Sequence, residues 1–218
     1  MSSFLSGRNF GSKIQTSDIA DNATTNAKMA DDAIGIAELS ATATASSSTF
    51  LRGDNSWATP ASSTLGTPTA TTSGTTIDIS IPSGTKAIWV SYDGVSPASS
   101  GEIALRLGDS GGVETSSYIS YLGSYRAGPA TSMDSSTTLW KLVEQANAAC
   151  IWYGTVQLFL QNSSTNNWVF SSAFNTLAST TQTNVSSGQK ALSAELTTLQ
   201  LLTTSGGYDA GAVNVVYM

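Results

Sequence analysis

The stretch Thr76-Ile77-Asp78-Ile79-Ser80-Ile81 alternates polar and apolar residues without a break, and Pro82-Ser83-Gly84 follows it directly. Alternation with a period of two places the three isoleucines on one face of a strand, because successive side chains of a strand point to opposite sides. Pro, Ser and Gly in succession favour a turn. This stretch therefore predicts a half-buried β-strand that ends in a turn.

Short segments of the same kind recur from Thr67 to the C-terminus, and turn residues separate them at a spacing typical of a β-sandwich. Residues 140–149 are the one plausible short helix, but a strand leading into a loop is favoured there. The sequence thus predicts an all-β fold, an antiparallel two-sheet sandwich of about nine or ten strands. The expected strands are 76–81, 87–92, 102–107, 117–122, 138–143, 151–161 with a break at Gly154, 168–173, 196–204 and 212–217.

Composition agrees with this fold class and excludes several functions. The 218 residues include 36 Ser, 29 Thr and 19 Gly, and only 11% are charged. Ser, Thr and Gly are mediocre to poor in helix interiors, so an all-helical protein is excluded. A net charge of −6 without any His offers no basic surface for nucleic acid and no imidazole for a metal or for proton transfer. We expect no nucleic-acid partner, no metal and no cofactor.

The sequence also lacks the signatures of membrane insertion, and the absence of His argues against catalysis. No stretch approaches the 18 apolar residues of a membrane span, and residues 1–10 lack the pattern of a signal peptide. Acyl-transfer catalysis needs a base that activates a nucleophile, and without His that base would have to be a Lys, a carboxylate or an amine, so we expect no enzyme. Glycoside hydrolysis needs only two carboxylates, and Glu102, Asp109, Glu114 and Glu144 keep it as the least favoured alternative. Residues 109–114 predict a tight glycine loop more than a cation site.

The N-terminal region carries an internal repeat of its own. Ile19-Ala-Asp-Asn-Ala23 returns ten residues later as Met29-Ala-Asp-Asp-Ala33. The larger apolar residues follow a spacing of five, which fits neither a helix nor a strand, so they must pack on copies of the chain or on a partner. A flexible acidic linker is the alternative. The candidate contact residues are Ile14, Ile19, Met29, Ile34 and Leu39.

The segment Phe50-Leu-Arg-Gly-Asp-Asn-Ser-Trp57 contains a turn at Gly53-Asp54, and this turn explains the Arg-Gly-Asp tripeptide better than an integrin ligand does. We expect Trp57 to pack back on the turn. The segment resembles a signature common in bacteriophage fibre proteins, in which such a run closes a shaft. The N-terminal repeats are similar to shaft segments of those trimeric fibres. This resemblance implies a virion-attachment arm over 1–40 and a linker over 41–66.

The C-terminal part, residues 67–218, resembles a domain found at the end of many phage fibre and small virion proteins. The matching pieces are Ile81–Gly84, Leu107–Tyr118, Thr165–Trp168 and Tyr208–Tyr217. The resemblance implies a homotrimeric, jelly-roll-like tip on a tail fibre, attached through its arm to tail or baseplate proteins and binding a glycan or protein of the host surface. A head fibre or capsid decoration protein is the alternative. Either protein is located in the virion.

Aromatic side chains are the candidate receptor-binding groups, because a ring offers an apolar face for sugars together with a polar edge. Tyr121 and Tyr125, with Arg126 beside them, lie in a stretch that reads as an exposed loop, and they are the receptor-binding candidates. Trp89 and Trp152 lie in apolar runs and are expected in the core. Other expectations are a buried, unreactive Cys150 and a buried Trp168 whose replacement by alanine unfolds the domain, whereas Tyr125→Ala leaves folding intact.

Overall fold

The computed structural model describes residues 41–126, 131–146, 148–176 and 181–218. The predicted arm over 1–40 lies outside the described residues, and so do its contact residues Ile14, Ile19, Met29, Ile34 and Leu39. The chain divides into two compact units between Pro60 and Ala61.

The described part of the first unit is a small hairpin. Strand β1 (Phe50–Leu51) pairs with β2 (Trp57–Ala58), so that Leu51 lies opposite Trp57. The backbone N–H of Arg52 donates to the carbonyl of Ser56 at 2.8 Å and closes the turn between the strands. The predicted turn at Gly53-Asp54 is therefore confirmed.

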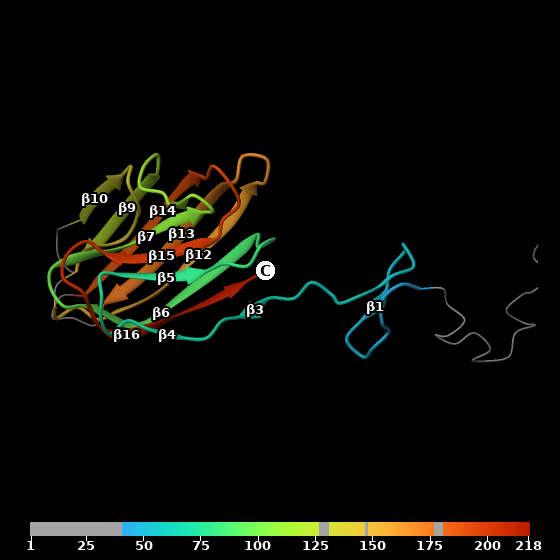
Figure 1. Cartoon of the computed structure of the whole chain (residues 1–218). Coiled ribbons are helices and arrows are strands. Elements are labelled where there is room, and N and C mark those ends of the chain that lie inside the picture. The colour runs from blue at the N-terminus through green and yellow to red at the C-terminus, as the bar shows by residue number, and fades with distance from the viewer. Residues whose placement is uncertain (1–40, 127–130, 147, 177–180) are drawn as a thin grey trace, which may run out of the picture. The chain divides into compact units, whose positions relative to one another are not determined.

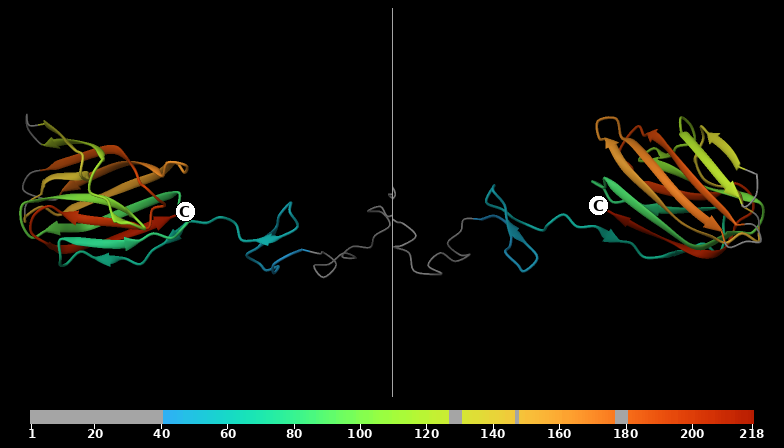
Figure 2. Two further views of the ribbon diagram at one scale, coloured as in Figure 1. Left: turned by 45° about the horizontal axis from the view of Figure 1, so that its top comes forward. Right: turned by 180° about the vertical axis from the view of Figure 1, so that it is seen from behind.

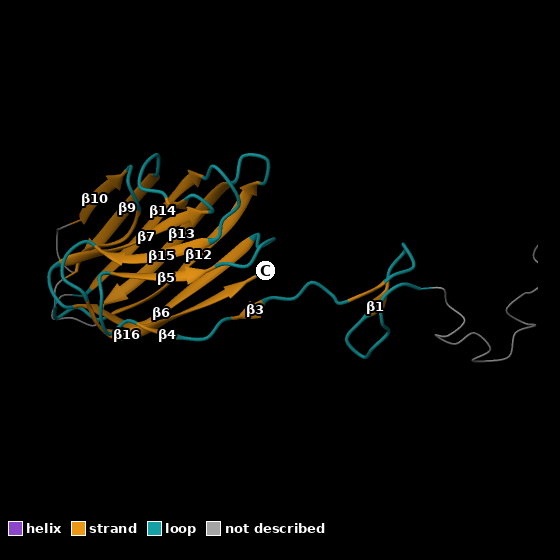
Figure 3. Ribbon diagram, in the orientation of Figure 1, coloured by secondary structure: helices purple, strands orange, loops and turns teal. Residues whose placement is uncertain are grey.

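The second unit consists of two antiparallel sheets that face each other, and its described residues include no helix (Figures 2 and 3). These findings confirm the all-β, antiparallel prediction. The large sheet has the order β10-β9-β14-β13-β12-β6-β16-β3, with β4 also paired to β16, and the small sheet has the order β11-β7-β15-β5, with β8 paired to β7. The large sheet contains β3 (Thr64–Leu65), β4 (Thr69–Ala70), β6 (Ala87–Pro97), β9 (Ile119–Arg126), β10 (Thr131–Ser136), β12 (Trp152–Asn162), β13 (Asn167–Thr176), β14 (Gln182–Ala191) and β16 (Tyr208–Tyr217). The small sheet contains β5 (Thr76–Ser80), β7 (Gly101–Asp109), β8 (Gly112–Val113), β11 (Trp140–Ala146) and β15 (Thr198–Thr203).

One hydrophobic core fills the space between the sheets. Ile88 and Val90 of the large sheet and Leu105 and Leu107 of the small sheet belong to the same buried cluster. The isoleucines of β5 behave as the alternation predicts, since Ile77 and Ile79 are half-buried and pack against this cluster. Trp152, Trp168 and Cys150 are buried, as expected.

Two expectations about individual residues are wrong. Gly154 does not break β12, which runs through it. The glycine instead allows close approach to β13, because a Cβ there would lie 2.5 Å from the carbonyl oxygen of Ala173. Trp89 lies outside the core, on the outer face of the large sheet, where its ring meets Phe159 edge-on with centroids 5.8 Å apart. An apolar run in a strand therefore did not mean burial on both faces.

Strands β10 and β14 lack the alternation that marks a half-buried strand, so the sequence did not predict them. In β14 the residues that point inward are polar, among them Gln182, Asn184 and Ser186. Hydrogen bonds satisfy most of them, such as Gln182 Nε2 to Ser124 Oγ at 2.7 Å and Ser172 Oγ to Ser186 Oγ at 2.5 Å. A strand whose core face is polar carries no hydrophobic signal.

The two ends of the large sheet differ in what they contain. Leu65 of β3 pairs with Val216, so the chain joins the sheet beside the C-terminus, at what we call the entry end (Figure 1). The strand registers place the last residues of β9 at the opposite end, the far end, together with Pro97, Trp152 and Tyr208.

Candidate functional site

Tyr121 and Tyr125 lie on a strand and not on a loop, which corrects the sequence-based expectation. They belong to β9, where Tyr121, Gly123 and Tyr125 point outward from the large sheet and Leu122 points into the core. The two tyrosines are 57% and 55% exposed. A separation of four residues keeps two side chains on the same face of a strand.

Neighbouring strands add further groups to this face. Gly123 lies opposite Met133 of β10 and Val185 of β14, and Tyr121 lies opposite Ser187. Ser171 of β13 lies opposite Ser187 in turn. Together these side chains line a shallow depression of about 400 Å³. We call this the tyrosine surface, and define it as Tyr121, Gly123, Tyr125, Met133, Ser171, Val185 and Ser187.

Gly123 forms the floor of the depression. A Cβ built there would lie 3.5 Å from Cε2 and 3.6 Å from Oη of Tyr125, so the Tyr125 ring leans back over the glycine. The ring thereby covers backbone that a side chain would otherwise cover.

Arg126 does not belong to the tyrosine surface. Its Nε donates to Oε1 of Gln182 at 3.2 Å, and Gln182 is buried on the inner face of the sheet. Neighbouring residues of a strand point to opposite faces, so Arg126 lies on the other side from Tyr125. The expected grouping of Arg126 with the two tyrosines is therefore wrong.

The distribution of polarity beneath the tyrosine surface is inverted. In β14 Val185 is exposed on the outer face, whereas Asn184 and Ser186 are buried on the inner face. In β9 the tyrosines point outward, whereas Ser120 and Ser124 are buried. Folding alone favours the opposite arrangement, because it gains from burying apolar groups and loses from burying polar ones. An outer face with this pattern indicates an interaction surface.

The chemistry of the tyrosine surface is neutral. Its side chains are two phenols, a thioether, a valine and the hydroxyls of Ser171 and Ser187. Met133 is 83% exposed and lies at the edge strand β10. Aromatic faces with nearby hydroxyls suit a sugar ring, since C–H groups pack on the ring and sugar hydroxyls bond to the serines. Sequence reasoning missed Met133, Val185 and both serines, because only strand pairing brings them to β9.

We expect Gly123→Val to separate binding from folding. The added Cβ has ordinary van der Waals room, and valine suits a strand better than glycine, so the free energy of unfolding should stay equal or rise by up to about 1 kcal/mol. The branched side chain fills the floor and displaces the Tyr125 ring, so a ligand that packs on this ring should be lost. Urea denaturation and binding to a glycan array measure the two effects. A stable variant that still binds at full strength would place the binding site elsewhere.

The glycine loop at 109–114 is structural, as predicted. Asp109 Oδ1 accepts the N–H of Gly111 at 2.8 Å, and its Oδ2 accepts from the Ser193 hydroxyl at 2.6 Å and the N–H of Ala194 at 2.9 Å. The carboxylate thus joins the β7–β8 turn to the loop before β15. No group of three or more His, Cys, Asp or Glu among the described residues could hold a metal ion. None of those residues forms a helix able to cross a membrane.

Asp109 should make stability depend on pH. The hydrogen bond from Ser193, followed by that from Gly111, lowers the pKa of its carboxyl below the ordinary value. Its contribution is therefore complete above the unfolded pKa of about 4 and is lost as the pH falls through the folded pKa. We expect the difference in unfolding free energy between wild type and Asp109→Asn to be larger at neutral pH than in acid. An equal difference at both pH values would contradict this role.

Comparisons of this chain with protein-family models, with curated proteins and with solved structures found no match. The resemblance to phage fibre proteins thus rests on the sequence motifs alone. The functional conclusions below rest on these motifs and on the geometry of the described residues.

Proposed function

We propose that the protein is a non-enzymatic bacteriophage tail fibre, whose C-terminal domain binds glycans of the host surface through the tyrosine surface. The inverted polarity of β9 and β14 is the observation that carries the proposal. These strands place two tyrosines and a valine in solvent and bury serines and an asparagine, beside Leu122, on the inner face. Exposed apolar groups above a largely polar inner face are typical of an interaction surface.

The position of the tyrosine surface supports attachment to a host. Tyr125 is the second-last residue of β9 and lies near the far end, whereas Leu65 enters the sheet at the entry end. A ligand at Tyr125 therefore approaches the domain away from the point where the rest of the chain joins it. A trimeric, jelly-roll-like tip, held to tail or baseplate proteins by residues 1–40, is part of this proposal.

Weak contacts are enough for such a protein if it is trimeric. A single sugar on two aromatic rings binds weakly, but three sites on one fibre raise the effective concentration of each remaining site once the first has bound. The neutral chemistry of the tyrosine surface also makes binding insensitive to salt, because no charge is screened. Strong weakening by salt would contradict this mode of binding.

Labelling the C-terminal domain on intact particles tests the location. Gold-conjugated antibodies against residues 61–218 should appear at the tail or its base in electron micrographs. Label spread over the head would replace the tail-fibre proposal with a head fibre or decoration protein of the same fold. Absence of label from particles would contradict both assignments.

A further inference from the structure

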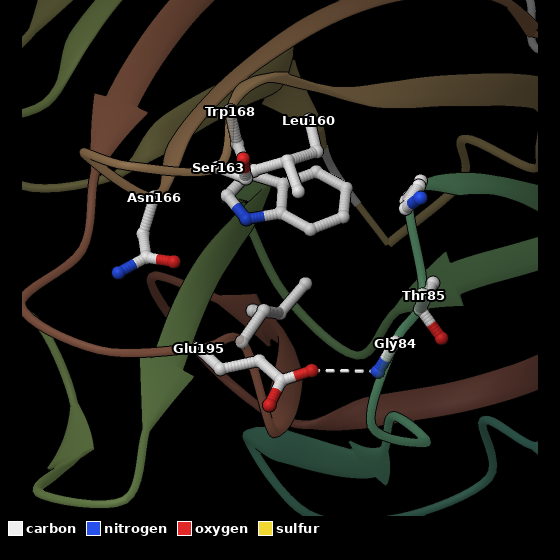
Figure 4. A pocket seen from close by; sticks show the side chains of 9 residues that line it. Gly84, Thr85, Leu160, Ser163, Asn166, Trp168 and Glu195 are labelled. Carbon is white, nitrogen blue, oxygen red and sulfur yellow. Dashed lines mark hydrogen bonds between the residues drawn. The ribbon is translucent and has the colours of Figure 1, made fainter.

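A second pocket, of about 300 Å³, lies at the entry end of the domain. Three separate segments form it: the turn at Gly84–Lys86 between β5 and β6, the β12–β13 hairpin, and the loop at Glu195–Leu196 before β15 (Figure 4). Leu160, Leu196 and Trp168 supply apolar walls. Loops that meet at one end of a sandwich are common positions for binding sites.

Glu195 presents a carboxylate that is already fixed in place. Its Oε1 accepts the N–H of Gly84 at 2.6 Å and the hydroxyl of Ser83 at 3.0 Å, and its Oε2 lies 3.1 Å from the same hydroxyl. These bonds join two of the three segments. A carboxylate has about four lone-pair sites, so Glu195 keeps acceptor capacity for a ligand.

Trp168 places an indole N–H at the pocket (Figure 4). The residue is only 2% exposed, and Figure 4 shows its indole nitrogen on the side of the ring that faces Asn166 and Glu195. No hydrogen bond joins Nε1 to any described residue, although the buried Trp140 donates from its own Nε1 to the Gln189 carbonyl. An N–H that opens onto a pocket is available to a ligand that accepts a hydrogen bond.

Asn166 is held in a conformation that asparagine tolerates better than most residues. Its φ is +47°, in the left-handed region, and its carbonyl accepts the N–H of Leu192 at 3.1 Å. The side-chain amide, which carries both a donor and an acceptor, lines the pocket and makes no hydrogen bond to the described residues. A left-handed asparagine is common at the turn of a β-hairpin, and here the turn brings its side chain to the pocket lining.

We propose that this pocket binds a single neutral sugar ring. Trp168 Nε1 would donate to a ring or hydroxyl oxygen, Glu195 would accept from one hydroxyl, and Asn166 would donate to and accept from another. The volume lies at the lower limit for ligand pockets, which suits one ring and excludes an oligosaccharide. A neutral ligand is favoured because the two charged residues of the lining, Lys86 and Glu195, have opposite signs.

Sugar binding to the whole chain tests this site. Saturation-transfer-difference NMR with millimolar D-glucose, D-galactose and N-acetyl-D-glucosamine should reveal at least one bound sugar. Asn166→Gly keeps the left-handed backbone and removes the amide, and Trp168→Phe keeps an aromatic ring and removes the N–H. Each variant should weaken binding by roughly tenfold, since each leaves sugar groups without a partner. Trp168 belongs to the core and Asn166 does not, so Asn166→Gly still tests the site if Trp168→Phe disturbs folding.

Tyr153→Ala is the matched control, because this exposed tyrosine lies outside both the pocket and the tyrosine surface and its loss should leave sugar binding unchanged. Sugar binding lost in Tyr121→Ala but retained in Asn166→Gly would overturn the pocket and leave the proposed function intact. No saturation transfer from any of the three sugars would also overturn it. Tighter binding of the free amino acid serine than of the sugars would overturn the proposal as well, because the pocket would then prefer a ligand that carries both a positive and a negative charge.

Discussion

Replacing both Tyr121 and Tyr125 with alanine is expected to abolish attachment to the host surface while leaving the domain folded. Each ring contributes apolar contact area and an aromatic interaction, together worth about 1–2 kcal/mol. Loss of both rings therefore weakens each site by roughly a hundredfold, and the loss is multiplied further in the proposed trimer, where three sites act together. Binding of the fluorescently labelled chain to host cells measures the effect.

Phe159→Ala is the matched control for the tyrosine substitutions. Phe159 is an exposed aromatic residue of the same sheet face, but its register partner is Ala87, at the entry end. It should change host binding by less than twofold if the tyrosine surface is the site. Equal loss in Phe159→Ala and in the double tyrosine variant would mean that the whole outer face is a contact, and would contradict the local site.

The fold could be predicted from the sequence wherever one face of a strand is apolar. Ile77 and Ile79 lie half-buried against the core, as their alternation required. The same rule gave no signal for β14, because Gln182, Asn184 and Ser186 occupy its inner face. The sequence cannot indicate which neighbours satisfy these groups, since Ser124 and Ser172 come from other strands.

The candidate site was predictable only in part, for a similar reason. Tyr121 and Tyr125 are identified from residue type, within a stretch that reads as a loop. If the stretch is interpreted as a strand, the alternation of its side chains places Gly123 on the same face as the tyrosines and Arg126 on the opposite face. Met133 and Val185 join the site through antiparallel pairing between distant segments. Pairing of this kind depends on register, which a single sequence does not determine when both faces of a strand are mixed.

The inner and outer faces beneath the tyrosine surface depend on each other. Gln182 of β14 donates to Ser124 of β9 and to Asn184 of its own strand, and the first of these bonds fixes the strand that carries the exposed tyrosines. Asn184 Nδ2 and Thr176 Oγ1 are buried without a partner among the described residues, so this region has a polar interior that suits bound water. A buried layer of hydrogen-bonded polar groups contributes less to the free energy of unfolding than an apolar layer does. The apolar cluster between the two sheets must therefore supply most of the stability.

Trp140→Ala is expected to remove a large share of that stability. Trp140 is fully buried, stacks on Phe170 with centroids 4.3 Å apart, and meets Tyr118 edge-on at 5.9 Å. Because Trp140 belongs to the small sheet and Phe170 to the large one, the stack joins the two sheets. Loss of the ring costs about 3–5 kcal/mol for the cavity and about 1 kcal/mol more for the aromatic contacts.

Guanidinium denaturation of the Trp140→Ala variant tests this role of the core. A domain of this size has about 5–15 kcal/mol of stability in all, so the midpoint should shift far down while the slope stays unchanged. Tyr125→Ala should stay within about 0.5 kcal/mol of wild type, because its ring is exposed. If both variants unfolded at the wild-type midpoint, the two sheets would not depend on the Trp140–Phe170 stack. The apolar core that compensates for the polar layer would then have to lie elsewhere between them.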